Sequence, residues 1–270
     1  MAFAMLQDMT QCIACKACQV ACKEWNELPA TSTRNEGDYE NPRDLGPTTW
    51  TRVQFLETAD ETADAQWLFF KQQCMHCADA PCVKVCPTGA LKNDPRGFVS
   101  FERDLCNGCG YCADFCPFGV ARVDVGSVWT GGAKAAKCTM CEDRVSNGEQ
   151  PACAKACPTA AITFGDRDEL ITAGKERVAA LQAQGSTSAN LYGEKERLGV
   201  LYVLPEPPSR YDRALPHGPA GSRLVASFWQ KVLQPAGAIG LALGAVGLVA
   251  NYVTVSRHDR AEKVAAREEP

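Results

Sequence analysis

Sixteen cysteines fall into four runs of four, and this pattern limits the fold more than any other feature of the 270-residue chain. Two of the runs lie between Cys74 and Cys116 and read C-x2-C-x4-C-x3-C-P and C-x2-C-x2-C-x3-C-P. Three thiolates on one tight loop can each reach a different iron of one cubane, whereas a fourth that precedes proline is leaving the loop. The spacing therefore predicts [4Fe-4S] clusters.

The other two runs flank this pair at a distance. The run from Cys12 has the C-x2-C-x2-C-x3-C spacing without the proline, and the run from Cys138 reads C-x2-C-x11-C-x3-C-P. Four complete runs form an internal repeat, which two nested ferredoxin-like units would house most simply. We therefore expect an α+β fold with two nested ferredoxin-like bis-[4Fe-4S] units.

In bacterial two-cluster ferredoxins the fourth cysteine of a run binds the other cluster of its pair. Applied to both units, this swap assigns every cysteine as an iron ligand in one of four sets. The outer unit holds set 1, Cys12, Cys15, Cys18 and Cys157, and set 2, Cys22, Cys138, Cys141 and Cys153. The inner unit holds set 3, Cys74, Cys77, Cys82 and Cys116, and set 4, Cys86, Cys106, Cys109 and Cys112. We therefore expect four [4Fe-4S] clusters.

Other uses of cysteine fit this pattern less well. Disulfide frameworks belong to small secreted domains and require no fixed spacing. Structural zinc uses C-x2-C pairs but seldom a third cysteine two residues later, so a membrane-anchored structural zinc protein is the remote alternative. The net charge of −4 argues against a nucleic-acid partner.

Some polar residues lie beside the cysteines. His76 stands between two predicted ligands, but four thiolates already fill each cluster, so we expect it to pack or to support a ligand. Positive charge near the sulfurs would raise reduction potentials, although a solvated surface charge is the default for each cation. The cations near the runs are Lys84, Lys134, Lys137, Lys155 and Arg144.

The segments between the runs predict short elements. A surface loop after Cys22 is followed by strands in TRVQFLE and WLFFK. The turn residues in LKNDPRGFVSF predict a hairpin, and ARVDV and AAITFGD predict short strands. Residues 167–184 predict a helix, and residues 185–221 resemble a linker rich in Pro and Gly.

Residues 232–256 carry no charged side chain. At about 1.5 Å per helical residue they exceed the roughly 30 Å hydrocarbon core of a bilayer. Trp229 and Tyr252 stand near the two ends, where amphipathic rings favour the membrane interfaces. We therefore expect one transmembrane helix in contact with lipid over 232–255. Four of its glycines share one face, which permits close packing on other membrane helices: Gly237, Gly240, Gly244 and Gly247.

The chain thus divides into six predicted parts. They are the outer ferredoxin-like unit (1–22 and 138–199), an inserted loop with strands (23–73), the inner ferredoxin-like unit (74–137), an extended linker (200–227), the transmembrane helix (228–256) and a polar tail (257–270).

Four cluster motifs followed by one carboxy-terminal membrane helix resemble the iron-sulfur (beta) subunit of respiratory formate dehydrogenases of the formate dehydrogenase-N type. The motifs over 12–158 are shared with electron-transfer subunits of other molybdenum or tungsten oxidoreductases. The closer similarity lies in LYVLPEPPSRY and FWQKVLQPAGAIGLALGAVGLVANYV, with Trp229, Lys231 and Pro235 as the recurrent points.

This resemblance implies a complex in which a molybdopterin or tungstopterin subunit oxidises formate. The present chain, with no catalytic residue of its own, would pass the electrons to a membrane cytochrome b that reduces quinone. The cluster of set 1 would face the catalytic subunit, and the cluster of set 4 the membrane. An equivalent subunit of a membrane hydrogenase or of another pterin oxidoreductase is the alternative.

Charges around the membrane helix predict its orientation. More basic residues follow the helix within a dozen positions than precede it, so the positive-inside rule puts the carboxy terminus in the cytoplasm and the cluster domain in the periplasm. Residues 1–11 lack the basic and apolar regions of a secretory signal. The resemblance therefore implies export together with a signal-bearing catalytic partner.

Overall fold

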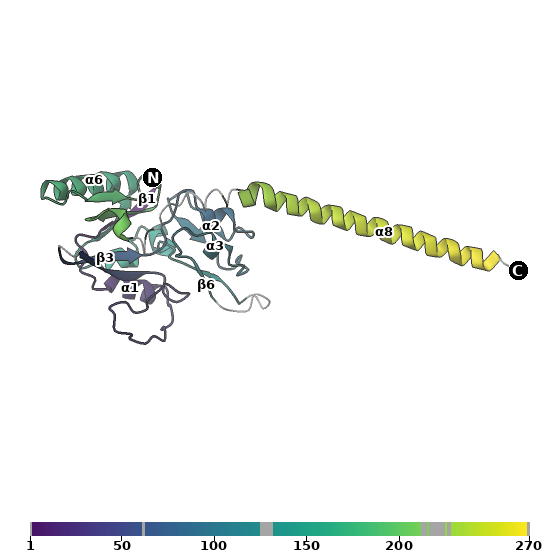
Figure 1. The fold of residues 1–270 in the computed structure, drawn as a ribbon, viewed down its shortest axis with the longest axis horizontal. Helices are drawn as coiled ribbons and strands as arrows, with labels where there is room; N and C mark the ends of the chain where they lie inside the picture. The colour runs from purple at the N-terminus through teal and green to yellow at the C-terminus, as the bar shows by residue number, and fades with distance from the viewer. Residues whose placement is uncertain are drawn as a thin grey trace. The chain divides into compact units, whose positions relative to one another are not determined.

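The computed structural model describes residues 2–60, 63–124, 132–211, 215, 225 and 228–268. The chain forms two compact units, Met1–Ala226 and Ser227–Pro270. The first has an α+β fold and contains all sixteen cysteines, and the second is a long helix. Figure 1 shows their secondary structure.

A four-stranded sheet in the order β8-β1-β10-β9 forms the centre of the first unit. β1 pairs in parallel with β10 and antiparallel with β8, while β9 is antiparallel to β10. Every residue of β10 is buried, so this strand lies in the core. The strands are β1 (Phe3–Asp8), β8 (Ile162–Asp166), β9 (Asn190–Tyr192) and β10 (Val200–Leu204).

The prediction of a linker from 185 to 221, and of an extended linker over 200–227, is wrong where β9 and β10 lie. The sequence VLYVL is a short apolar run with β-branched residues, which suits a strand buried on both faces. The adjacent prolines obscured that signal. Beyond β10 the chain makes a 3-10 turn, Pro208–Tyr211, and the parts of the predicted linker at 212–214, 216–224 and 226–227 lie outside the described residues.

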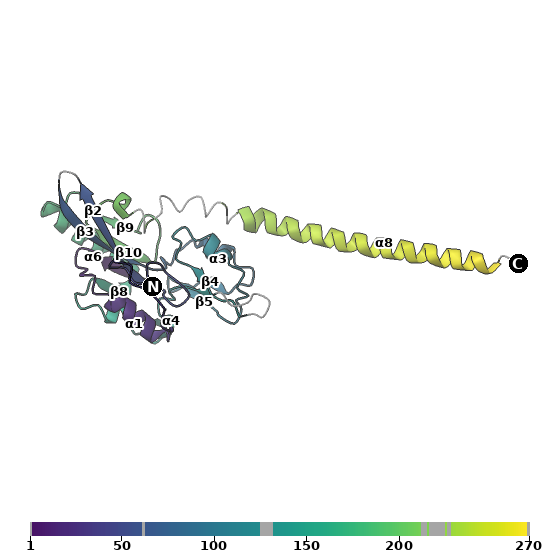
Figure 2. The ribbon, with the colours of Figure 1, turned by 60° about the horizontal axis from the view of Figure 1, so that its bottom comes forward.

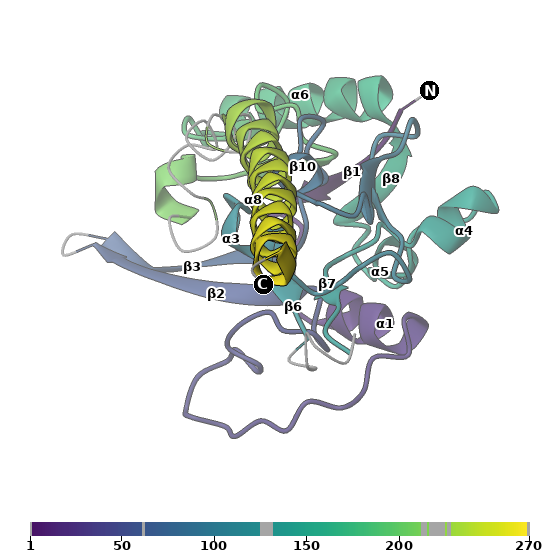
Figure 3. The ribbon, with the colours of Figure 1, turned by 90° about the vertical axis from the view of Figure 1, so that its right-hand side faces the viewer.

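Helix α6 (Arg167–Ala183) covers one face of the sheet, as Figure 3 shows, and confirms the predicted helix. The Asp166 side chain caps it by accepting hydrogen bonds from the backbone N–H groups of Asp168 and Glu169. Gly174 allows a close approach to the sheet, because a Cβ there would stand 2.8 Å from a methyl carbon of Leu191.

Strands β2 (Arg52–Asp60) and β3 (Ala63–Gln72) form a long antiparallel ribbon, visible in Figure 2, which confirms the two strands predicted there. The expected long loop before them leaves α1 (Ala17–Trp25) and extends away from it in Figure 3. A buried ion pair between Arg52 and Glu40, 2.5 Å apart, ties this loop to β2.

Short elements surround the cysteine loops. The predicted hairpin is present as β4 (Leu91–Asn93) paired with β5 (Val99–Phe101). β6 (Arg122–Val123) pairs with β7 (Ala135–Ala136). The short helices are α2 (Pro81–Lys84), α3 (Tyr111–Asp114), α4 (Glu142–Ser146) and α5 (Ala152–Lys155).

The second unit is helical from Trp229 onward. A π-helical turn, η2 (Trp229–Leu233), leads into α8 (Gln234–Glu268). The stretch Lys231–Ser256 is long and apolar enough to cross a membrane, and its side chains are not buried within the chain. The helix continues past Ser256 through most of the predicted polar tail, whose last two residues lie outside the description.

Candidate iron-sulfur sites

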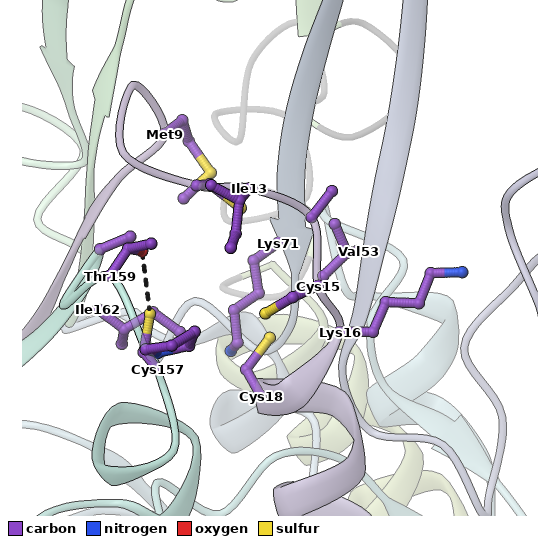
Figure 4. A pocket seen from close by; sticks show the side chains of 14 residues that line it. Met9, Ile13, Cys15, Lys16, Cys18, Val53, Lys71, Cys157, Thr159 and Ile162 are labelled. Carbon is purple, nitrogen blue, oxygen red and sulfur yellow. Dashed lines mark hydrogen bonds between the residues drawn. The ribbon is translucent and has the colours of Figure 1, made fainter.

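The four cysteines of set 1 line one hollow of about 370 Å3, shown in Figure 4. Cys12, Cys15 and Cys18 come from the loop that enters α1, and Cys157 follows α5. The loop winds tightly because Ala14 and Lys16 adopt positive φ angles of 53° and 61°. Apolar side chains such as Met9, Ile13, Val53 and Ile162 complete the wall.

Set 2 lines a second hollow of about 310 Å3. Here Cys138, Cys141 and Cys153 meet Cys22, which α1 carries from the other run of the outer pair. All four cysteines are buried. Met140 and Cys141 have positive φ angles, and the N–H of Met140 donates a hydrogen bond of 3.4 Å to the Cys138 sulfur.

Set 4 lines a third hollow of about 320 Å3. Cys106, Cys109 and Cys112 come from the loop that enters α3, and Cys86, the last cysteine of the other inner run, follows α2. The Cys106 sulfur accepts a 3.4 Å hydrogen bond from the backbone N–H of Ala135. The three hollows have similar sizes and the same lining chemistry, so each fits the same kind of group.

In set 3, Cys77 and Cys82 pack on one apolar cluster around Ala80 and Leu91, and Cys74 and Cys116 lie near enough to Cys82 to affect its pKa. Burial first, and then repulsion from Cys74, Cys116 and Cys77, raise the pKa of the Cys82 thiol well above its ordinary value. Cys116 also raises the pKa of Cys74. The structure thus brings the four members of each predicted set together, including the fourth cysteine from the other run; ligation of iron by them is a proposal.

The thiols are suited to binding a polynuclear group. Burial first, and then nearby thiolates, raise the pKa of Cys18, Cys112 and Cys138 to about 12. Within the described ranges, no three His, Cys, Asp or Glu side chains are placed to hold a single metal ion. A cubane instead accepts one thiolate at each of its irons, so its ligands surround a hollow. The lining of these hollows fits that requirement.

The four sets follow one another in a row. Besides burial, repulsion from the Cys153 thiolate of set 2 raises the pKa of Cys18 in set 1. In the same way, repulsion from Cys74 of set 3 raises the pKa of Cys138 in set 2. Sets 3 and 4 share one apolar cluster around Ala80 and Leu91, to which both sets contribute cysteines. The row therefore runs from set 1 through sets 2 and 3 to set 4.

The two ends of this row contain its exposed cysteines, Cys15 of set 1 and Cys109 of set 4. All four cysteines of set 2 are buried, whereas set 3 has one buried and three half-buried cysteines. An electron carrier at either end would thus be accessible to a partner.

His76 packs and supports a ligand loop, as predicted. Its ring is buried, and Nδ1 accepts a 3.0 Å hydrogen bond from the backbone N–H of Val99. Burial first, then Lys137 and Lys71, hold its pKa well below the ordinary value, so the ring is neutral. It fixes the loop of Cys74 and Cys77 against β5.

Two of the cations predicted near the runs contact the backbone of a cysteine. Lys137 is buried, and its Nζ donates to the carbonyls of Val99 at 2.8 Å and Cys138 at 3.0 Å. Lys134 donates to the Cys106 carbonyl at 2.6 Å.

The other three lie elsewhere. Lys84 pairs with Asp79 at 2.6 Å, and the buried Arg144 pairs with Glu149 at 2.6 Å. Lys155 lines a surface hollow beside α1.

Sequence reasoning missed Lys71, which is buried and reaches toward the sulfurs of set 1 in Figure 4. Burial lowers its pKa, but thiolates of sets 1 and 2 raise it more, and the net shift is upward. Residues 70–72 of β3 and residue 73 after it are all buried, so the sequence here has no alternation of buried and exposed positions that would indicate this lysine.

Comparison with known proteins agrees with this arrangement. Two family models, each described as a 4Fe-4S dicluster domain, match residues 65–167 and 11–90. The formate dehydrogenase-O iron-sulfur subunit of Escherichia coli (strain K12) is 41% identical over 257 residues, covering 93% of this chain and 83% of that protein. The nitrate-inducible formate dehydrogenase iron-sulfur subunit of the same strain is 40% identical over 257 residues, with 93% and 85% covered.

A shorter match joins the chain to another kind of complex. The hydrogenase-2 operon protein HybA of Escherichia coli O157:H7 is 36% identical over 184 residues, which cover 65% of this chain and 55% of that protein.

Proposed function

Because this chain belongs to the family of formate dehydrogenase iron-sulfur subunits, we propose that it holds four [4Fe-4S] clusters and conducts electrons from a catalytic subunit to a membrane cytochrome b. The catalytic subunit would carry a molybdopterin or tungstopterin and oxidise formate, and the cytochrome would reduce quinone. The clusters would supply one-electron carriers. The chain itself performs no bond chemistry in this proposal.

The observation that carries the proposal is the row of four cysteine sets with one exposed cysteine at each end. Such a row gives electrons an entrance at one partner and an exit at another. The apolar walls of the hollows of sets 1 and 2 limit the access of water to these two sites, and exposure to solvent is one of the factors that set cluster potentials. By the family pattern, set 1 faces the catalytic subunit and set 4 faces the membrane.

The helix Lys231–Ser256 supports a membrane anchor at residues 232–255. Trp229 and Lys231 lie in the π-helical turn, and Pro235 occupies the second position of α8. Proline lacks an N–H and favours the first turn of a helix. Because the Trp229 ring is amphipathic, the turn would lie at the membrane interface, with the apolar helix crossing the bilayer beside the cytochrome.

Metal analysis of the anaerobically purified complex tests the cluster content. Four [4Fe-4S] clusters require about sixteen irons per copy of this chain, counted after subtracting the haem iron of the cytochrome and any iron of the catalytic subunit, with an equal amount of acid-labile sulfide and little zinc. Mainly zinc, or about half of that iron, would refute the assignment.

An electron-transfer subunit of a membrane hydrogenase is the second candidate, and the match to the hydrogenase-2 operon protein favours it. Identification of the large subunit that co-purifies with a tagged copy of this chain distinguishes the two. A pterin-containing subunit with formate-oxidising activity supports our proposal, and a nickel-iron subunit supports the alternative.

A further inference from the structure

Lys71 is a buried cation that faces both cysteine sets of the outer unit. Its side chain is 1% exposed and reaches from β3 into the hollow of set 1 (Figure 4). Its charge acts on Cys12 and Cys18 of set 1, and also on three thiols of set 2. These are Cys22, Cys138 and Cys153. Gln73, which accepts a hydrogen bond from the Lys71 ammonium, lines the hollow of set 2, so one ammonium group lies beside two neighbouring sites.

The surroundings hold this ammonium in place without neutralising it. Nζ donates a hydrogen bond to the amide oxygen of Gln73, which is uncharged. The amide nitrogen of Gln73 lies 3.4 Å from the Met5 sulfur, so the oxygen is turned toward the lysine. The Tyr202 hydroxyl donates to the Lys71 carbonyl at 2.9 Å, and this tyrosine stacks on Phe70 at 4.6 Å.

An isolated buried ammonium is costly unless negative charge compensates it. The thiolates of two sets provide that charge. Reduction of a cluster adds one more negative charge, and a fixed cation nearby stabilises it strongly where the surroundings have a low dielectric constant. The burial of Lys71 therefore gives its charge more effect than a solvated lysine would have.

We propose that Lys71 is a positioning residue whose buried charge raises the reduction potentials of both clusters of the outer unit. The inference rests on the proposed function, since it requires clusters at sets 1 and 2. A lysine beside only one set would raise the potential of one cluster, whereas Lys71 raises both together and so changes the potential difference between them less.

The test is an anaerobic redox titration of the purified complex, followed by electron paramagnetic resonance. In Lys71→Met we expect two of the four clusters to fall in potential together while the iron content stays at the parental value. At a fixed ambient potential their ratio of reduced to oxidised form should fall at least tenfold, which is about 59 mV for a one-electron couple. Lys71→Arg keeps the charge and should restore both potentials.

Lys16→Met is the matched control. Lys16 lines the same hollow, but its Nζ donates to the Tyr39 carbonyl at the surface, where solvent screens its charge. Lys16→Met should lower the reduction potential of the set 1 cluster less than Lys71→Met does, and it should leave the potential of the set 2 cluster unchanged. Equal shifts from the two variants, or unchanged potentials in Lys71→Met, would overturn the proposal.

A double variant covers the case in which Lys71→Met disturbs folding. Lys71→Met with Gln73→Leu removes the ammonium and its partner together, which leaves no unpaired polar group. If both apolar variants lose the irons of the outer unit and Lys71→Arg keeps them, Lys71 serves assembly and the tuning proposal fails. A parental complex without about sixteen irons would instead refute the proposed function itself.

Discussion

Gly108 is the residue on which the loop of set 4 depends most closely. Its φ is +73°, and a Cβ there would lie 2.4 Å from the Ala133 carbonyl oxygen. Gly108→Ala should therefore move the loop and make the set 4 cluster labile, beyond the roughly 1–3 kcal/mol of left-handed strain alone. Gly110→Ala is the control, because its φ is +85° but nothing lies within 4 Å. Iron retention during dilution measures the effect, and equal losses in the two variants would contradict it.

The swapped cysteine is testable at Cys116. Besides burial, repulsion from Cys116 raises the pKa of Cys74 and of Cys82, which both belong to set 3. Cys116 itself is the last cysteine of the run whose first three cysteines belong to set 4. Cys116→Ser should therefore broaden or abolish the set 3 signal in electron paramagnetic resonance. Cys86→Ser should broaden or abolish the set 4 signal instead, since repulsion from Cys86 contributes to the raised pKa of Cys112 in set 4. Damage confined to set 4 in Cys116→Ser would show that each run serves its own cluster.

The raised thiol pKa values predict how cluster assembly depends on pH. Burial raises the pKa of Cys18, Cys112 and Cys138 to about 12, above the ordinary value of 9.0, so these thiols carry protons in the metal-free fold. That contribution to the stability of the metal-free fold is full below pH 9 and is lost as pH rises toward 12.

Iron binds thiolates, so assembly releases these protons and becomes more favourable as pH rises. Iron bound after anaerobic reconstitution should therefore increase from pH 7 to pH 9. Occupancy that is flat or that falls over this range would contradict the prediction.

The cysteine sets could be predicted from the sequence because the spacing within each run directly fixes which thiols can meet on a loop. The structure brings each predicted set together, and ligation itself stays a prediction. Lys71 could not be found this way, since its importance arises from the packing of β3 against loops far away in the chain. A charged residue in a strand buried on both faces has no local signature.

At the scale of elements, local patterns predicted the ribbon, the β4–β5 hairpin and α6. β1 was missed because its sequence, FAMLQD, contains no β-branched residue and so has a weak strand signal. β10 was missed because the Pro and Gly content of residues 185–221 predicted a linker and outweighed the five apolar residues of VLYVL. Both strands owe their stability to each other, through a parallel pairing that joins residues about 195 positions apart, such as Met5 and Val200.

The glycine face of α8 makes a prediction about the membrane partner. A Cβ on Gly240 or Gly244 would meet nothing within 4 Å in this chain, so the glycines are available to a neighbouring helix. Gly240→Leu with Gly244→Leu should weaken association with the cytochrome, because close backbone approach is lost.

The matched control is Ala238→Leu with Ala242→Leu, which places the same two leucine side chains on the opposite face of the helix. Co-purification of the cytochrome with a tagged catalytic subunit measures association. Equal retention in the two double variants would mean that the glycines do not form the contact.

For the whole molecule, the sequence predicted the α+β class and the apolar helix. It did not predict the central sheet that supports the cysteine loops. The outer and inner units lie within one compact unit, Met1–Ala226, in which β10 belongs to the central sheet rather than to a linker. A repeat of four motifs reveals how many sites there are, whereas the sheet that supports them depends on pairings between distant strands. The division into nested units stays a prediction.

The orientation of the whole chain in the membrane is the last prediction. Basic residues follow the helix at Arg257, Arg260, Lys263 and Arg267, and only Arg223 and Lys231 precede it in a comparable window. We propose that the carboxy terminus is cytoplasmic and the cluster domain periplasmic, because cytoplasmic flanks are enriched in Lys and Arg. Asp259 and Glu262 lie in the same tail but contribute little to this bias.

Protease added to intact spheroplasts should digest the cluster domain and leave a tag after Pro270 protected, while lysed cells should lose both. A cytoplasmic marker protein that survives in the intact sample serves as the control for membrane integrity. Protection of the cluster domain together with loss of the tag would reverse the orientation. In that case electrons would enter the row on the cytoplasmic side, and the catalytic partner would need no export.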